Sequence, residues 1–164
     1  MDWDKISDII LYSSFAVLGV FVILGLYQWI SRKSLKKVDR KILAMIPPLI
    51  LMAITYVVFD KFIVLATRPN GSGEPSFPST HAMVVATIYF MVIVALPKYL
   101  KNKTLCTFLD LVMSALITLV AYGRIASNMH STTDVIAGVA FGAVFAVIYY
   151  FISKKPKKKE TTNE

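Results

Sequence analysis

Long apolar stretches dominate this sequence and restrict the folds that are open to it. Four windows of about 20 residues, the length that crosses a bilayer core, carry few charges: roughly 9–30, 42–66, 105–122 and 134–152. A fifth stretch, 82–96, reaches that length only if its helix begins near Ser79 and continues to about Lys98. With 56% hydrophobic residues and a mean hydropathy of +0.63, the chain is too apolar for an ordinary soluble domain. We therefore predict an all-α integral membrane bundle of about five transmembrane helices, forming one domain over residues 1–153.

The basic residues are unevenly distributed over the loops between these stretches. Cytoplasmic loops are enriched in Lys and Arg, so the side that carries more of them is predicted to face the cytoplasm. If the N-terminus lies outside, fourteen of the 18 basic residues fall inside: Arg32, Lys33, Lys36, Lys37, Arg40, Lys41, Lys98, Lys101, Lys103, Lys154, Lys155, Lys157, Lys158 and Lys159. Only Lys5, Lys61, Arg68 and Arg124 remain outside. We therefore predict an outer N-terminus, a cytoplasmic C-terminus and a basic cytoplasmic tail over residues 154–164 that contacts anionic lipid.

One loop collects charge where a membrane protein normally avoids it. The stretch KFIVLATRPNGSGEPSFPSTH, from Lys61 to His81, places two cations and a histidine beside a segment rich in Gly, Pro and Ser. Ionisable residues in such places usually serve a function. Lys61 and Arg68 are seven residues apart, two turns along one face of a helix, so we expect both to line one wall of a cavity. The alternatives are an interfacial lysine that pairs with Asp60, and a cation at a helix end.

The end of this stretch has the sequence of a helix start. Pro78 fixes the backbone just ahead of a helix, and Ser79 suits the N-cap position. Free backbone N–H groups at a helix N-terminus bind anions, and His81 in the first turn is directed at whatever they hold. We therefore predict a phosphate site here, although Ser79 would cap the helix whatever the function.

The second histidine of the chain lies in the next outer loop. Arg124 precedes His130 by six residues, and Asp134 follows it by four. A carboxylate at that spacing near a helix start can accept a hydrogen bond from the imidazole, which is how a nucleophilic histidine is oriented. A capping box of Ser131 with Asp134 explains the carboxylate equally well, but it leaves the arginine and the histidine on the same side unexplained.

Together these residues resemble the signature of the type 2 phosphatidic-acid phosphatase superfamily, which also includes bacterial acid phosphatases and vanadium haloperoxidases. Its three parts stand here as Lys61-x6-Arg68-Pro69, Pro78-Ser79-Thr80-His81 and Arg124-x5-His130-x3-Asp134. The resemblance covers about Lys61 to Asp134, and the flanking segments match only as membrane spans. Two positions differ from the usual pattern: Thr80 stands where glycine is common, and Gly123 stands where serine usually precedes the arginine.

The resemblance implies a role for each of these residues. His130 attacks phosphorus and forms a phosphohistidine, Asp134 holds the ring of that histidine, and His81 protonates the leaving oxygen. The groups implied to bind the phosphoryl oxygens are Lys61, Arg68, Ser79, Thr80 and Arg124. Water then releases phosphate.

The chemistry of phosphoryl transfer supports this assignment independently. Its transition state spreads negative charge over the equatorial oxygens, so fixed cations and N–H donors in a poorly hydrated pocket lower the barrier. The rival interpretation is a zinc hydrolase in which His81, His130 and Asp134 bind the metal. The neighbouring lysine and arginines would repel a divalent cation, so we predict metal-independent catalysis without a cofactor.

The place of the site indicates the class of substrate. A pocket at the lipid–water boundary of a membrane bundle suits a lipid whose phosphate lies at the surface and whose tail stays in the bilayer. The closest resemblance is to bacterial undecaprenyl-diphosphate phosphatases, which implies a multi-pass protein of the cell membrane that recycles the carrier lipid of cell-wall synthesis at the extracytoplasmic face. Phosphatidate or phosphatidylglycerophosphate is the alternative substrate.

Partners other than lipid are weakly supported by the sequence. A non-enzymatic anion- or lipid-binding protein would not need two histidines, one of them with a carboxylate four residues on. The basic surface favours membrane lipids over nucleic acid. Gly138 and Gly142 have a spacing typical of close helix contacts, which we assign to packing within one bundle. The oligomeric state stays open.

Overall fold

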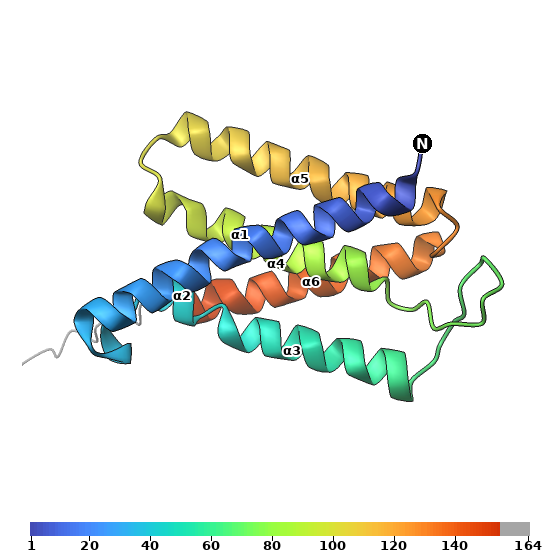
Figure 1. The fold of residues 1–164 in the computed structure, drawn as a ribbon, viewed down its shortest axis with the longest axis horizontal. Coiled ribbons are helices and arrows are strands. Elements are labelled where there is room, and N and C mark those ends of the chain that lie inside the picture. The colour runs from blue at the N-terminus through green and yellow to red at the C-terminus, as the bar shows by residue number, and fades with distance from the viewer. Residues whose placement is uncertain (155–164) are drawn as a thin grey trace, which may run out of the picture.

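The computed structural model describes residues 1–154 and is a bundle of long helices (Figure 1). Its elements are α1 (Trp3–Arg32), the short 3-10 helix η1 (Leu35–Lys37), α2 (Arg40–Leu43), α3 (Ile46–Val57), the π-helical turn η2 (Val58–Phe62), α4 (Thr80–Tyr99), α5 (Lys103–Ala126) and α6 (Thr132–Ser153). Within the described residues, five helical segments are long and apolar enough to cross a membrane, with α2, α3 and η2 forming one of them. The predicted all-α bundle of five spans is confirmed. Most of the predicted cytoplasmic tail, residues 155–164, lies outside the described residues.

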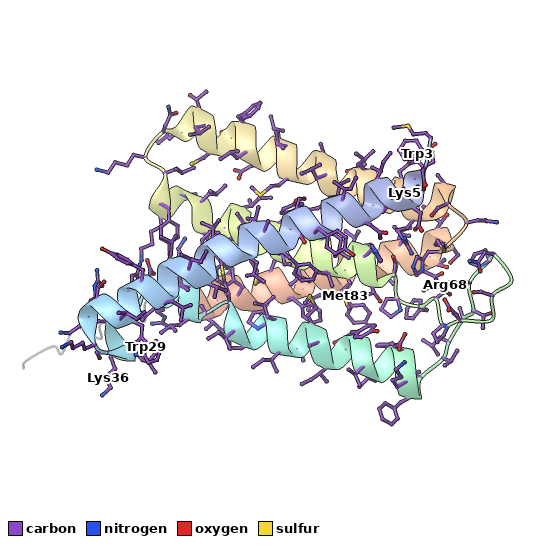
Figure 2. All side chains as sticks on the ribbon, viewed as in Figure 1. Trp3, Lys5, Trp29, Lys36, Arg68 and Met83 are labelled. Carbon is purple, nitrogen blue, oxygen red and sulfur yellow. The ribbon has the colours of Figure 1, made fainter. Side chains whose placement is uncertain are left out.

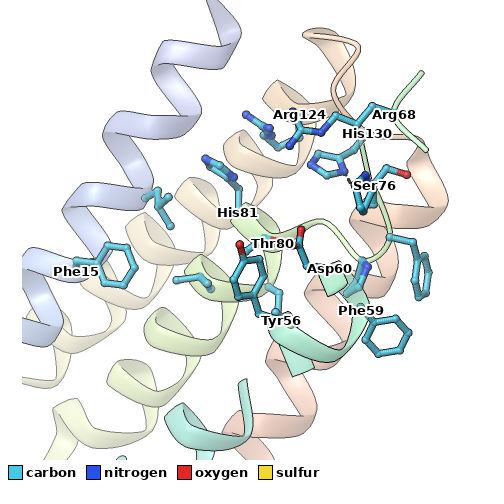
Figure 3. Close-up of a pocket in the computed structure, with 16 residues that line it drawn as sticks. Phe15, Tyr56, Phe59, Asp60, Arg68, Ser76, Thr80, His81, Arg124 and His130 are labelled. Carbon is cyan, nitrogen blue, oxygen red and sulfur yellow. Dashed lines mark hydrogen bonds between the residues drawn. The ribbon is translucent and has the colours of Figure 1, made fainter. Parts of the chain in front are cut away.

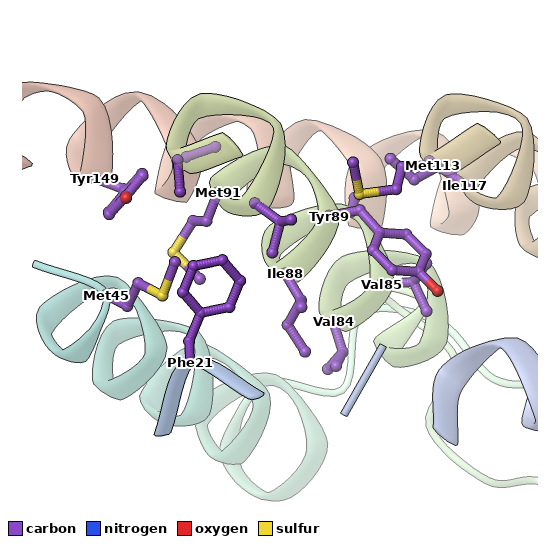
Figure 4. Close-up of a cluster of buried hydrophobic side chains, with 14 of the residues drawn as sticks. Phe21, Met45, Val84, Val85, Ile88, Tyr89, Met91, Met113, Ile117 and Tyr149 are labelled. Atoms are coloured by element: carbon purple, nitrogen blue, oxygen red, sulfur yellow. The ribbon is translucent and has the colours of Figure 1, made fainter. Parts of the chain in front are cut away.

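Helix α4 is the centre of the bundle. Two-thirds of its span (67%) is buried inside the protein, whereas the other four spans bury between 17% and 33%. Its apolar side chains Val84, Val85, Ile88 and Met91 form the core together with side chains from α1, α5 and α6 (Figure 4). The outer helices expose many large apolar side chains, as expected where lipid is the surrounding solvent.

Small residues set the contact between α4 and α6. A Cβ atom added to Gly138 would lie 2.5 Å from the carbonyl oxygen of Ser79, and one added to Gly142 would lie 2.6 Å from the Cβ atom of Ala86. Both distances are shorter than any tolerated contact, so only glycine allows the two helices to lie this close. The predicted packing of these glycines within the bundle is confirmed, and it fixes the start of α4 against the start of α6.

The loops gather at the two ends of the bundle. The N-terminus, the loop 63–79 and the loop 127–131 lie at one end, which we call the N-terminal end (Figure 1). The loops 33–39 and 100–102 and residue 154 lie at the opposite end, which we call the basic end. Trp3 and Arg68 mark the first end, and Trp29 and Lys36 mark the second (Figure 2). Both predicted functional loops therefore share one end, whereas the side of the membrane that this end faces stays a prediction.

Candidate functional site

A cavity of about 260 Å³ opens at the N-terminal end of the bundle. Figure 3 shows His81, His130, Arg68 and Arg124 along one side of it, with Phe15, Tyr56 and Phe59 on the other. Its walls also include Leu11, Asp60, Pro75, Ser76, Phe77, Pro78, Thr80, Met83 and Val84. The two histidines, which are 49 positions apart in the sequence, thus line one space, as the sequence predicts.

A short hairpin in the loop 63–79 presents Arg68. The Arg68 N–H donates to the carbonyl oxygen of Glu74 at 2.9 Å, and the Ser76 N–H donates to the carbonyl oxygen of Ala66 at 2.9 Å. Gly71, at the tip, has φ +78°, a conformation that glycine adopts without strain. The hairpin holds the Arg68 side chain against the cavity and pairs its guanidinium with the Glu74 carboxylate at 2.8 Å.

A tight turn after α5 brings His130 back beside Arg124. Asn128 adopts a left-handed conformation with φ 60°, which asparagine tolerates better than most residues. The backbone N–H of His130 then donates to the carbonyl oxygen of Arg124 at 3.1 Å. Both side chains are almost completely buried. The six-residue spacing of the third motif therefore places an arginine and a histidine side by side in the cavity wall.

The ring of His130 is oriented by a backbone carbonyl and not by the predicted carboxylate. Its Nδ1 lies 2.9 Å from the carbonyl oxygen of Ser76, whereas the Asp134 carboxylate is 4.0 Å away. Asp134 instead accepts a hydrogen bond from the Ser131 N–H at 2.9 Å and forms a complete capping box. The expected hydrogen bond between Asp134 and His130 is therefore wrong in this structure, because the helix cap takes the carboxylate. Asp134 keeps its place beside the imidazole as a buried negative charge.

The surroundings of His130 favour its neutral form. Burial, followed by the positive charge of Arg124, lowers the pKa of His130 from 6.5 to about 4, although the Ser76 carbonyl and Asp134 act in the opposite direction. A carbonyl oxygen only accepts hydrogen bonds, so the single proton of the neutral ring resides on Nδ1. The Nε2 atom then carries the free lone pair that a nucleophile requires.

The start of α4 has the predicted register. Ser79 occupies the N-cap position and His81 lies in the first turn. The Ser79 side chain makes no capping hydrogen bond, however, and its Oγ is buried without a partner. The Ser79 N–H donates to the carbonyl oxygen of Asp134 at 2.9 Å, which ties this helix start to that of α6. Ser79 itself does not line the cavity, although its neighbours Pro78 and Thr80 do.

Lys61 does not share a helix face with Arg68. The helix ends at Phe62 in the π-helical turn η2 and not near Ala66, so Arg68 lies beyond the helix that carries Lys61. The Lys61 side chain is 68% exposed, pairs with Asp60 at 2.7 Å, and is not among the residues that line the cavity. Its role as a phosphate ligand stays a prediction.

Helix α1 supplies two carboxylates that the sequence analysis did not assign to the site. Asp4 pairs with the guanidinium of Arg124, and Asp8 lies 2.9 Å from Nε2 of His81. With Glu74 on Arg68 and Asp60 on Lys61, every cation predicted for the site has a carboxylate neighbour. The positive charge that the sequence analysis assigns to the site is therefore largely paired in this structure. A signal was present, since Asp4 and Asp8 are four residues apart on one face of a membrane helix.

The cavity nevertheless retains donors without partners. Among the described residues, Arg68 Nε, Arg124 Nε, Ser76 Oγ and Ser79 Oγ are all buried and make no hydrogen bond. Buried donors in a folded protein nearly always have a partner, so four at one end of the bundle indicate a ligand with several acceptor oxygens. No group of three His, Cys, Asp or Glu side chains within residues 1–154 is arranged to hold a metal ion. The alternative ligand set His81, His130 and Asp134 is therefore not assembled.

Sequence comparisons agree with the motifs. The model of the PAP2 superfamily matches residues 47–158. Two relatives from Arabidopsis thaliana are similar over 92 residues, 55% of this chain: "Lipid phosphate phosphatase epsilon 2, chloroplastic", 26% identical, and "Lipid phosphate phosphatase epsilon 1, chloroplastic", 24% identical. The aligned part is 32% and 33% of their respective lengths. The chain thus spans about a third of these relatives.

The fold is also similar to that of a solved structure. The first transmembrane PAP2 type phosphatidylglycerolphosphate phosphatase from Bacillus subtilis superimposes with a TM-score of 0.73. The match covers 94% of this chain and 78% of that protein, at 21% sequence identity. At this identity the likeness concerns the fold, and it includes α1, which precedes the part that the family model matches.

Proposed function

The chain belongs to the PAP2 superfamily, and from this premise we propose that it is a membrane lipid phosphatase that acts on a lipid phosphate or diphosphate. The observation that carries the proposal is the set of four buried, unpartnered donors around the cavity that both histidines line. A phosphoryl group offers several acceptor oxygens to such donors. Guanidinium groups bind these oxygens well because their planar donors match phosphate geometry.

The proposed reaction has two steps. In the first, the Nε2 lone pair of His130 attacks the terminal phosphorus while the bond from phosphorus to the leaving oxygen breaks, and His81 gives that oxygen a proton. The leaving oxygen is the alcohol oxygen of a lipid phosphate or the bridging oxygen of a lipid diphosphate. In the second, water attacks the phosphohistidine, His81 takes the proton of the water, and the bond from phosphorus to nitrogen breaks. The Nδ1 proton of His130 stays on Nδ1 throughout, donated in a hydrogen bond to the carbonyl oxygen of Ser76 at 2.9 Å.

The cavity walls support a lipid as substrate. Phe15 of α1, Tyr56 of α3 and Phe59 of η2 lie away from the arginines, with the Asp60 carboxylate beside them (Figure 3). The apolar side chains of Leu11, Met83 and Val84 also line the cavity. A phosphate among the basic residues would therefore leave the first carbons of its lipid among apolar side chains. A soluble phosphate ester would gain nothing from this surface.

Two substrates have separate support. The resemblance to bacterial undecaprenyl-diphosphate phosphatases favours undecaprenyl diphosphate, with cleavage to undecaprenyl phosphate and phosphate at the extracytoplasmic face of the cell membrane. The structural neighbour is a phosphatidylglycerolphosphate phosphatase, which favours phosphatidylglycerophosphate as the second candidate. In both cases we propose catalysis without metal, through a phosphohistidine.

The test is phosphate release by the purified full-length protein in detergent with excess EDTA. Undecaprenyl diphosphate, phosphatidate and phosphatidylglycerophosphate are compared side by side, with the His130→Ala protein as the blank. We expect release from at least one lipid, unchanged by EDTA and absent from the blank. Absence of release from all three contradicts the proposal, and release that needs an added divalent cation contradicts its metal-independent form.

A further inference from the structure

We infer that Asp8 of α1 is the positioning residue of His81, so that the first membrane helix completes the acid half of the site. This inference rests on the proposed function. The Asp8 carboxylate lies 2.9 Å from Nε2 of His81, although the two residues are 73 positions apart. Asp8 precedes residues 47–158, which match the family model, and it was not recognised from the motifs.

The contact decides which nitrogen of His81 can reach the substrate. A carboxylate only accepts hydrogen bonds when ionised, so the Nε2 atom facing Asp8 carries a proton. Nδ1 of His81 has no hydrogen-bond partner among residues 1–154. The His81 side chain lines the cavity, whereas Asp8 does not. Nδ1 is therefore the nitrogen that gives its proton to the leaving oxygen, while the Nε2 proton stays on Nε2 and is donated to the Asp8 carboxylate.

The two histidines are held by partners that suit opposite tasks. His130, which must be neutral to attack, is held by the uncharged carbonyl of Ser76 and has Arg124 beside it. His81, which must carry a proton to the leaving oxygen, is held by a carboxylate. A carbonyl directs a ring without adding charge, whereas a carboxylate also stabilises an imidazolium. The two rings therefore differ in the charge of the group that orients them.

Helix α1 is fixed on both sides of Asp8. Ser7 is fully buried against α5, where a Cβ atom on Gly123 would lie 2.5 Å from its Oγ. On the other side, the Ser13 hydroxyl lies 2.7 Å from the hydroxyl of Tyr89 on α4. Gly123, which replaces the serine usual before the arginine, therefore allows the close approach of α1. Gly123, where the family usually has serine, and the contact of Asp8 with His81 are therefore linked through the position of α1.

The leaving group provides the test. A general acid matters when the leaving oxygen is a poor leaving group, as in an alkyl phosphate, and is dispensable for p-nitrophenolate. We measure the first step by rapid quench, as phosphorylated protein from phosphatidate or phosphatidylglycerophosphate, whose leaving oxygen is an alkyl oxygen, and as the nitrophenolate burst from p-nitrophenyl phosphate. We expect Asp8→Asn to slow the step about 10- to 100-fold with the lipid, which is part of the rate enhancement that a general acid usually provides. With the nitrophenyl ester we expect a loss of about twofold or less.

Two further variants complete the design. Asp2→Asn removes a carboxylate from the exposed first turn of the same helix and keeps a capping side chain, so it should match the wild type with both substrates. In a His81→Ala background, Asp8→Asn should cost nothing further, because its effect acts through the imidazole. Equal slowing with both substrates, an additive loss in that background, or no slowing at all would each overturn the inference.

A second pair of variants displaces α1 and leaves its carboxylates Asp4 and Asp8 unchanged. Gly123→Ala should push Ser7 away and reproduce the leaving-group signature of Asp8→Asn. Adding Ser7→Ala should restore most of the rate, because it removes the 2.5 Å clash and leaves the 3.2 Å contact with the Trp3 carbonyl oxygen. If Asp8→Asn fails to fold, the Gly123→Ala protein and its Ser7→Ala double variant still test the inference. A loss of rate that Ser7→Ala does not relieve, or that is equal for both leaving groups, counts against it. Failure of the wild type to form phosphorylated protein from any ester would instead contradict the proposed function.

Discussion

At the basic end of the bundle, cations are numerous, and those that reach into the protein have partners. The buried Asp39 carboxylate pairs with Lys98, the Lys41 ammonium donates to the carbonyl oxygen of Val94 at 2.7 Å, and Arg40 donates to that of Ile152 at 3.0 Å. At the N-terminal end there are fewer cations, yet both arginines keep a buried Nε atom without a partner. A site in a membrane protein is therefore marked by donors that the protein leaves unpaired and not by the amount of charge.

The half of the bundle toward the basic end does contain unpartnered polar atoms among the described residues: the hydroxyls of Tyr99 and Tyr149 and Oδ1 of Asp110 in α5. The two hydroxyls lie beside apolar core side chains, the Asp110 atom is an acceptor and not a donor, and no histidine or arginine accompanies any of the three in a cavity. The difference between the ends can thus be tested by making a comparable substitution at each end and comparing the effects on activity and on stability.

The largest effect is expected from His130→Ala, which removes the proposed nucleophile and should abolish phosphate release. Tyr149→Phe is the matched change at the basic end, since it removes one buried, unpartnered hydroxyl there. It should leave turnover unchanged to within about twofold, as it touches no group of the site. Initial rates of both proteins at equal folded concentration measure this, and clear turnover by the His130→Ala protein would break the comparison.

Arg124→Gln should lower kcat/KM about 10²- to 10³-fold, the usual loss when one donor to a developing anion is removed. Lys98→Ala at the basic end should instead lower the unfolding midpoint, because it leaves the buried Asp39 carboxylate without its cation. Activity assays and thermal unfolding in the same detergent separate the two outcomes. A loss of activity in Lys98→Ala as large as in Arg124→Gln would remove the distinction between the ends.

How far the sequence predicts this site depends on the residue. The five spans and the meeting of both loops at one end follow from hydropathy and motif spacing. The role of Asp134 could not be decided, because the sequence is compatible both with a capping box with Ser131 and with a hydrogen bond to His130. Lys61 was misplaced because nothing local marks the helix end at Phe62. Asp8 was missed because its partner is distant in sequence.

The pH dependence of His130 follows from its burial and from Arg124. With a pKa of about 4 in the folded protein and 6.5 ordinarily, the unfolded chain binds more protons between these values. The free energy of unfolding therefore rises with pH through this window, and the contribution of His130 is lost as the pH falls toward 4. The chain has two histidines, so His81→Asn leaves one imidazole for NMR titration. A midpoint near 6.5 would show that the ring is solvated.

The smallest effect is expected at Lys61. Because its ammonium is mostly exposed and pairs with Asp60, Lys61→Ala should raise KM less than about tenfold and leave kcat nearly unchanged, as for a charge that only attracts an anionic substrate. Steady-state kinetics at two ionic strengths should show the effect fade as salt rises. A fall in kcat of the size expected for Arg124→Gln would instead indicate that Lys61 binds the phosphoryl group directly.

The central claim is that both imidazoles serve one phosphorus atom and that His130 receives it. The most direct measurement is to quench the protein during turnover of a radiolabelled lipid phosphate and to locate the label by mass spectrometry. The account predicts phosphate on Nε2 of His130, because Nδ1 is held by the Ser76 carbonyl. Label on His81 or on any other residue, or turnover that never produces a phosphorylated protein, would contradict it.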